Sequence, residues 1–218
     1  MNNLNYFTKI ILCFPLVVSL LLSGCVSKPE INLTQVNVTN VEQAKSWEMQ
    51  GKLAVKTTED KFSTNLYWLH TENSNELRLT TMLGTTVMSL KSDAKGAMLI
   101  LDGKTYRDDD PERLLSRLTG WSIPIDILPL WITGQISATD QVLSTDDANR
   151  PQKVQSHFGD TPWQVVFKSW QTQSGAQLPK LLELTREDIR LKIQISQWQA
   201  LTDSVTLSPE TPEKSNEQ

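Results

Sequence analysis

The stretch Trp47–Lys56 reads WEMQGKLAVK, and its large apolar side chains recur at even spacings. Trp47, Met49, Leu53 and Val55 share one face, while most of the positions between them carry Glu, Gln or Lys. Successive side chains of a β-strand point to opposite faces, so a period of two is typical of a half-buried strand. We therefore predict a strand here, with one face in a core and one in water.

Similar patterns recur on the C-terminal side of this strand. The turn-like run Thr57–Lys61 separates it from the next one, and Asp102-Gly103 is typical of a tight hairpin turn. Further strands are predicted at Phe62–Trp68, from Leu77 and Leu79, at Val87–Lys91, Ala97–Leu101, Lys104–Arg107, Trp163–Trp170 and Pro179–Thr185, and from Ile189 to Ser196. The chain is therefore expected to be mainly β.

One segment breaks this pattern and favours helices. Asp110-Pro111-Glu112 combines an N-cap, a proline at the first helical position and an acid in the first turn, and Gly120 can close the helix. A second short helix is predicted around Asp126–Ile132. Many antiparallel strands interrupted once by helices indicate a strongly curved sheet or incomplete barrel, with the helices over its open face.

The N-terminus has the pattern of a targeting segment. Lys9 precedes the apolar run Ile10–Leu22, which Pro15 interrupts, and the run ends in Leu22-Ser23-Gly24-Cys25. Charge, apolar core and small residues before a Cys form the lipobox pattern of bacterial lipoproteins, in which the Cys is lipidated. The alternative is an ordinary secretory signal with a chance cysteine. We predict a signal peptide at 1–24 and a lipid anchor on Cys25.

Composition places the domain boundaries and excludes some classes of function. Residues 25–45 are predicted to form a lipidated tether, 46–200 the folded domain and 201–218 a disordered acidic tail. The net charge is −4 without a basic run, which argues against nucleic-acid binding. Cys13 lies in the signal, so the mature chain has no cysteine pair for a disulfide. The seven Trp fit either a filled core or an apolar ligand surface.

The sequence contains little that points to catalysis. There is no glycine-rich phosphate loop and no G-x-S-x-G motif. His70 and His157, the only histidines, stand in polar contexts, which indicates surface positions. Asp108-Asp109-Asp110 does not have the spacing of a calcium loop, and its last residue already serves as the helix cap. We predict that the protein is not an enzyme and has no cofactor or metal.

The segment Thr81–Thr86, TMLGTT, is unusual for a connection between two strands because it carries Met and Leu beside Gly. Leu83 either folds back into the core or forms an exposed apolar knob that touches a membrane or an acyl chain. Burying a leucine contributes roughly 1.5–3 kcal/mol, enough to orient a protein at a bilayer but not to anchor it. The residues alone leave both interpretations open.

From about Trp47 to Trp198 the chain resembles the LolB family of outer-membrane lipoprotein-sorting receptors. The resemblance rests on the order of several short segments behind the lipobox. They are Gly51–Val55, Asn65–Trp68, Leu79–Thr86, Gly103–Tyr106, Leu118–Pro124, Leu130–Gly134 and the closing strand Ile189–Trp198. The acidic tail beyond Trp198 departs from the family pattern.

The resemblance implies an incomplete antiparallel β-barrel of about eleven strands with a helical lid, the fold shared with the soluble carrier LolA. It also implies a lipid-anchored monomer on the periplasmic face of the outer membrane. Its partners would be the carrier LolA, the acyl chains of lipoprotein cargo and outer-membrane lipid. The protruding loop that acts in membrane insertion matches Met82, Leu83 and Gly84, which favours exposure of Leu83.

An apolar cavity for acyl chains is the last feature that the resemblance implies. Candidate lining residues are apolar groups that alternate inward on strands or lie in the lid: Leu53, Leu66, Trp68, Leu79, Leu99, Trp121, Ile123, Ile132 and Phe167. The same face of a strand serves core and cavity, so each residue also fits an ordinary core. Two other functions stay open, a lipoprotein that binds small apolar ligands or glycolipids and a non-binding assembly scaffold.

Overall fold

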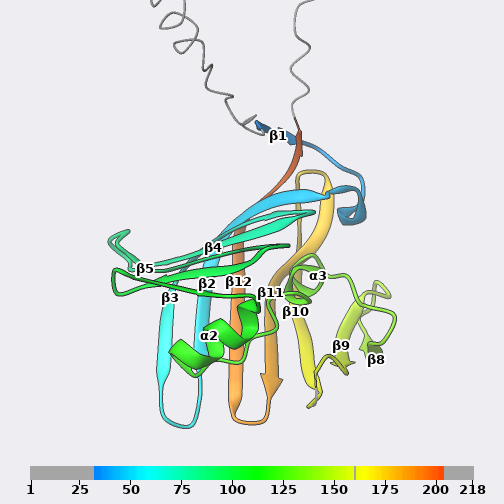
Figure 1. The fold of residues 1–218 in the computed structure, drawn as a ribbon. Coiled ribbons are helices and arrows are strands. Elements are labelled where there is room, and N and C mark those ends of the chain that lie inside the picture. Colours follow the sequence, from blue (N-terminus) through cyan, green and yellow to red (C-terminus); the bar gives the residue numbers. More distant parts are fainter. Residues whose placement is uncertain (1–31, 160, 204–218) are drawn as a thin grey trace, which may run out of the picture. The chain divides into compact units, whose positions relative to one another are not determined.

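Antiparallel strands form one curved sheet in the computed structural model, which describes residues 32–159 and 161–203 (Figure 1). The expected signal peptide, Cys25 and most of the expected tail lie outside these residues. Along the chain the strands are β1 (Leu33–Val36), β2 (Ser46–Lys56), β3 (Lys61–Thr71), β4 (Ser74–Thr80), β5 (Thr86–Asp93), β6 (Gly96–Leu101), β7 (Lys104–Asp108), β8 (Gln141–Thr145), β9 (Pro151–Ser156), β10 (Trp163–Gln173), β11 (Ala176–Arg186) and β12 (Ile189–Asp203). The helical elements are η1 (Val41–Gln43), α2 (Pro111–Thr119) and α3 (Leu128–Ile132).

The sheet is open because its first and last strands do not pair with each other. Its order is β7-β6-β5-β4-β3-β2-β12-β11-β10-β9-β8, and β1 pairs beside this path with β12. The long strands β2 and β12 join the N-terminal and C-terminal halves of the sheet. The incomplete antiparallel barrel that the sequence predicts is confirmed, and its main path has the expected number of strands.

Two local features shape the contact between β2 and β12. A register shift between Ile195 and Gln197 inserts an extra residue, so that Trp198 and Ala200 point inward like Ile195. Gly51 lies opposite Ile195, and a Cβ at this glycine would come within 2.0 Å of the Gln194 carbonyl oxygen. The two strands approach closely only because residue 51 has no side chain.

Three strands lie where none was predicted. β1 falls in the stretch expected to be a tether, and β8 and β9 fall between the second helix and Trp163. The residues of β8 are nearly all exposed, so its sequence carries no alternation to read. The compact unit Leu33–Gln218 therefore begins before residue 46, and its last strand extends to Asp203.

The two α-helices lie on the concave side of the sheet (Figure 1). Asp110 Oδ1 accepts the Arg113 backbone N–H, and Gly120 ends α2 in the left-handed region at φ 73°. α3 begins at Leu128, two residues after the predicted start at Asp126, and its N-cap residue Ile127 makes no side-chain hydrogen bond. We call Pro111–Ile132 the lid.

The core is continuous between the lid and the concave face. Five of the Trp, namely Trp47, Trp68, Trp131, Trp163 and Trp198, are buried, while Trp121 and Trp170 are partly buried against it. Every buried apolar residue of the described chain lies between Val41 and Leu201. The unit Leu33–Gln218 therefore carries the whole core and is expected to fold without the preceding residues.

Candidate functional site

An apolar cavity of about 30 Å³ lies between the lid and the concave face of the sheet. The sheet contributes Leu53, Leu66, Trp68, Leu77, Leu79, Met88, Leu90, Leu191 and Ile193, and the lid contributes Leu115, Trp121, Ile123, Ile125 and Leu128. None of these side chains is charged, and the exposed lining surface is entirely apolar. The cavity suits hydrocarbon chemically, although it is far smaller than the roughly 300–1,000 Å³ of typical ligand pockets.

Six of the nine predicted cavity residues line this space: Leu53, Leu66, Trp68, Leu79, Trp121 and Ile123. The other three, Leu99, Ile132 and Phe167, are buried elsewhere in the core. Phe167, for example, packs against Trp170 with ring centroids 5.5 Å apart. The period-two pattern identifies inward residues but not which part of the core contains a space.

Several lining residues were not predicted, although they follow the same apolar spacing as the predicted ones. Leu77 and Met88 lie on inward positions of β4 and β5, and Leu191 and Ile193 do so on β12. Leu115 lies on the apolar side of α2. Their alternation predicted burial, but only the tertiary arrangement assigns them to the cavity.

Polar contacts tie the lid to the end of β11. The Arg186 guanidinium, whose side chain is 12% exposed, donates to the Ser122 carbonyl oxygen at 2.8 Å and lies 3.8 Å from Glu112 Oε1. Ser122 Oγ also donates to Glu112 Oε1, at 2.8 Å. The same guanidinium stacks over Trp163, 4.5 Å from the ring centroid. One cation therefore holds both α2 and the segment that follows it.

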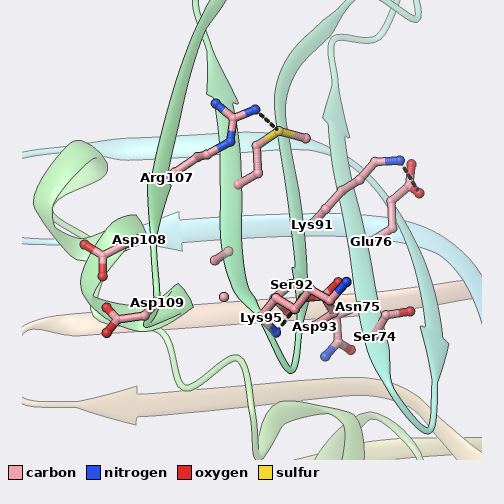
Figure 2. Close-up of a pocket in the computed structure, with 13 residues that line it drawn as sticks. Ser74, Asn75, Glu76, Lys91, Ser92, Asp93, Lys95, Arg107, Asp108 and Asp109 are labelled. Carbon is pink, nitrogen blue, oxygen red and sulfur yellow. Dashed lines mark hydrogen bonds and ion pairs between the residues drawn. The ribbon is translucent and has the colours of Figure 1, made fainter.

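A larger hollow, of about 750 Å³, opens on the outside near the ends of β4 to β7 (Figure 2). Its lining carries both signs of charge, with Glu76, Asp93, Asp108 and Asp109 beside Lys91, Lys95 and Arg107. Lys91 Nζ lies 2.8 Å from Glu76 Oε2. Mixed, solvated charges of this kind do not favour hydrocarbon, so we take the smaller apolar cavity as the site.

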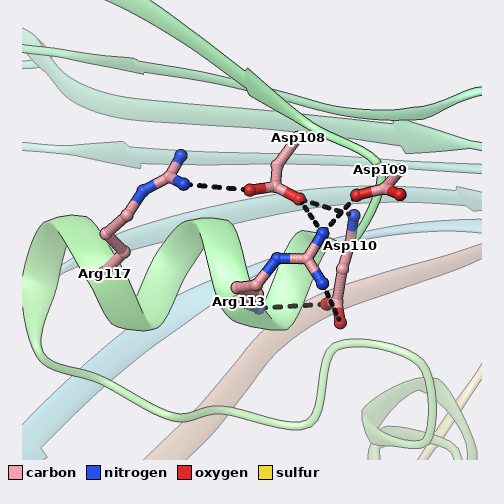
Figure 3. A network of polar contacts seen from close by, with 5 residues as sticks. All are labelled: Asp108, Asp109, Asp110, Arg113 and Arg117. Carbon is pink, nitrogen blue, oxygen red and sulfur yellow. Dashed lines mark hydrogen bonds and ion pairs between the residues drawn. The ribbon is translucent and has the colours of Figure 1, made fainter.

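Acidic residues next to α2 bind the arginines of the helix itself (Figure 3). Arg113 pairs with Asp108 and Asp109, and Arg117 Nη1 lies 3.1 Å from Asp108 Oδ2. Asp108 is 8% exposed; its hydrogen bond from Arg113 holds its pKa well below the ordinary value, against the opposing effect of desolvation. The predicted cap at Asp110 is confirmed. No group of metal-binding side chains occurs among residues 32–159 and 161–203.

The connection between β4 and β5 is a hydrogen-bonded turn with an exposed apolar tip. Gly84 N donates to the Thr81 carbonyl at 3.0 Å, and Thr81 N donates to the Thr85 carbonyl at 2.8 Å. Gly84 adopts φ 86°, which other residues rarely do. Met82 is 88% exposed and Leu83 is 96% exposed, so Leu83 is not a core residue. We call Thr81–Thr85 the apolar loop.

His70 is half-buried, which differs from the surface position that its polar sequence context indicated. Its ring lies 5.0 Å from that of Trp47, and its Nδ1 is 2.8 Å from Asn75 Oδ1. Burial lowers the pKa of this imidazole, and the contact with Asn75 opposes that effect. The imidazole ring therefore packs against the aromatic part of the core. His157 is exposed, as expected.

The fold and the site define a class of protein: an open β-barrel with a lidded apolar interior and an apolar loop on its rim. A solved structure of a LolA superfamily protein from Nitrosomonas europaea is 9% identical, with a TM-score of 0.45 over 72% of this chain and 86% of that one. No helix in the part of the chain that the structure describes has the length and apolar character of a membrane span.

The family described as "Outer membrane lipoprotein LolB" matches residues 45–198. The outer-membrane lipoprotein LolB of Shewanella loihica is 56% identical over 97% of this chain and 98% of its own length. That of Shewanella sediminis is 57% identical, with 98% of each chain covered. The chain therefore belongs to the LolB family. It is an outer-membrane lipoprotein of a lipoprotein-sorting family, not of an enzyme family.

Proposed function

We propose that this protein accepts lipoproteins from the periplasmic carrier LolA, shelters their acyl chains between the lid and the sheet, and inserts them into the outer membrane. In this proposal a lipid on Cys25 holds the protein at the periplasmic face of that membrane. The apolar loop enters the bilayer and directs the released chains into it.

The observation that supports this proposal is that the protein combines an apolar cavity with an exposed apolar loop. The side chains at the tip of the loop do not contribute to the core. The cavity has a wholly apolar lining, as an acyl-chain site requires. The loop then presents Met82 and Leu83 to water on a turn stabilised by three internal hydrogen bonds. Because these two side chains are exposed, the fold does not gain the several kcal/mol of free energy that their burial would contribute. This favours a role for them at a membrane or an acyl chain.

The cavity must enlarge before it takes an acyl chain. Sites for small apolar ligands have volumes of roughly 300–1,000 Å³, and the space under the lid is about 30 Å³. The lid contributes Leu115, Trp121, Ile123, Ile125 and Leu128 to the lining, so its outward movement widens the space without breaking the sheet. We therefore regard the described structure as the closed form of the site.

Transfer would run downhill. The sequence contains no nucleotide-binding motif that would supply energy. A chain of exchanges without an energy source proceeds only if each acceptor holds the acyl chains more tightly than the donor. The receptor would then bind the cargo more tightly than the carrier does, and the bilayer would bind it more tightly still.

A transfer assay tests the proposal. The unit Leu33–Gln218 is mixed with carrier that has been loaded with a lipoprotein, and each protein is then recovered separately. We expect the cargo to move to the receptor without added nucleotide. Cargo that stays on the carrier, while the receptor binds a small apolar probe, would favour a small-ligand or glycolipid function. Binding of neither would favour a scaffold.

A further inference from the structure

Five cations gather on the convex, outer face of the sheet although the whole chain is net negative. Lys61 on β3 is paired in register with Lys56 on β2, which is paired with Arg190 on β12. Lys192 lies two residues from Arg190 along β12, Lys52 lies four residues from Lys56 along β2, and all five side chains are exposed. We call these five residues the basic face.

None of the five forms an ion pair within residues 32–159 and 161–203. Glu183 is paired in register with Lys192, but its carboxylate lies 3.6 Å from Lys168 Nζ. Like charges that face each other across neighbouring strands destabilise a sheet. A row of three such cations therefore costs stability in the free protein, and an anionic partner would remove that cost.

The basic face begins at the base of the apolar loop. Asn65 Nδ2 donates to the Thr81 carbonyl at 3.1 Å, and Asn65 is paired in register with Lys52. A polar groove of about 480 Å³ on the outer face includes Lys52 and Asn65 in its lining. Its lining also includes Tyr67, Arg78 and Thr80, and no carboxylate lines it. Lys52, at one end of the basic face, therefore lies near the base of the exposed apolar tip.

We infer that the basic face binds the phosphate headgroups of anionic lipids at the membrane surface while the apolar loop enters the bilayer. This inference rests on the proposed insertion by the loop, and it adds the class of lipid that the protein recognises. A bilayer offers hydrocarbon below a layer of phosphates, which matches an apolar tip beside cations. An acidic protein surface would match the cations but would leave Met82 and Leu83 without a partner.

Co-sedimentation with vesicles tests this inference. The unit Leu33–Gln218 is mixed with vesicles of phosphatidylcholine, either alone or blended with phosphatidylglycerol, at low and at high salt. We expect tighter binding to the blended vesicles at low salt, and high salt should remove the difference because it screens exposed charges. Equal binding to both kinds of vesicle at low salt would overturn the inference.

A triple variant assigns the effect to the basic face. Lys52→Gln/Lys56→Gln/Lys192→Gln should weaken binding to the blended vesicles roughly 100-fold, since each basic residue near an anionic surface strengthens binding about five-fold. The matched control Lys45→Gln/Lys95→Gln/Lys153→Gln removes the same charge elsewhere and should lose far less. Thermal unfolding verifies that both variants fold.

Two further results separate this inference from the function on which it rests. If the triple variant matches the control on blended vesicles but Leu83→Glu still lowers cargo insertion, the proposed function stands and the lipid inference is wrong. If the triple variant instead loses affinity for the carrier and not for vesicles, the face meets a protein, and the inference is again wrong.

Discussion

At the scale of single residues, a substitution of Leu83 should impair function with little effect on the stability of the fold. Because this side chain is 96% exposed, Leu83→Glu should change the free energy of unfolding by no more than about 0.5 kcal/mol. Acceptance of cargo should persist, whereas insertion into vesicles should fall about 10- to 100-fold, as expected if one leucine no longer enters hydrocarbon. Chemical unfolding followed by circular dichroism, together with an insertion assay, checks both.

Leu83→Met is the matched control for that substitution, because it preserves an apolar tip, and it should insert cargo nearly as well as the parent. Leu115→Glu is the opposite control. Leu115 is buried and lines the cavity, so this change should destabilise the fold. A Leu83→Glu protein that unfolds as Leu115→Glu does would mean that the loop belongs to the core.

Asp108 is predicted to make stability depend on pH. Arg113 holds the pKa of this carboxyl below its ordinary value, so the pair stabilises the fold above the unfolded-state pKa of about 3.9. That contribution is lost as the pH falls toward the folded-state pKa. Asp108→Asn should therefore be less stable than the parent at pH 7, and the difference should shrink steadily below about pH 4.

Urea unfolding at a series of pH values measures this difference. Asp109→Asn is the control, because Asp109 also pairs with Arg113 but is exposed, so its loss should matter less at every pH. If the difference in unfolding free energy between Asp108→Asn and the parent stays constant from pH 7 to pH 3, ionisation of Asp108 does not cause that difference.

At the scale of elements, the lid is expected to be held by Arg186. Arg186→Gln removes the cation that contacts Ser122 and Glu112, so the lid should open more readily. A hydrogen bond to a charged group contributes about 1.5–3 kcal/mol, and the affinity for an apolar fluorescent probe should rise about ten-fold. Titration of the probe measures this affinity.

Arg190→Gln provides the comparison for that titration. It also replaces an arginine near the β11–β12 turn, but Arg190 is exposed on the outer face of the sheet and should not influence the lid. An Arg186→Gln protein that keeps its fold and binds the probe no better than Arg190→Gln would show that Arg186 does not control access to the cavity.

The contact between β2 and β12 is predicted to require Gly51. Gly51→Val places a Cβ against the Gln194 carbonyl, and we expect a loss of at least about 1–3 kcal/mol in unfolding free energy, the usual cost of overpacking. Ala54→Val, on the outward side of the same strand, should be nearly neutral. Similar stabilities for the two variants in urea would contradict the close approach.

At the scale of the whole molecule, the sequence predicted what depends on local pattern. Strict alternation in Trp47–Lys56 and from Ile189 identified the two central strands, and Asp110-Pro111 located the start of α2. β8 was missed because almost all of its residues face water, so no period marks it. β1 was missed because it pairs only with the end of β12, a contact that no local pattern reveals.

The candidate site was predictable to the same extent. Apolar spacing on the strands and in the lid found six residues that line the cavity but could not separate them from Leu99, Ile132 and Phe167, because core and cavity share the same apolar faces. Exposure of Leu83 was not decided by the residues alone; only the family resemblance favoured it. The basic face was not predicted because its cations lie in two groups far apart along the chain, Lys52 to Lys61 and Arg190 to Lys192, which meet only across three strands.

The central claim is that acyl chains enter the space under the lid, and site-specific photo-crosslinking tests it most directly. A photoreactive residue replaces either Ile123, which lines the cavity, or Phe167, which is buried outside it. Each protein receives a lipoprotein with labelled acyl chains from the carrier and is then irradiated. We predict that the label attaches at position 123 and not at position 167. Transfer of cargo with no label at position 123, or with equal label at both positions, would contradict the account.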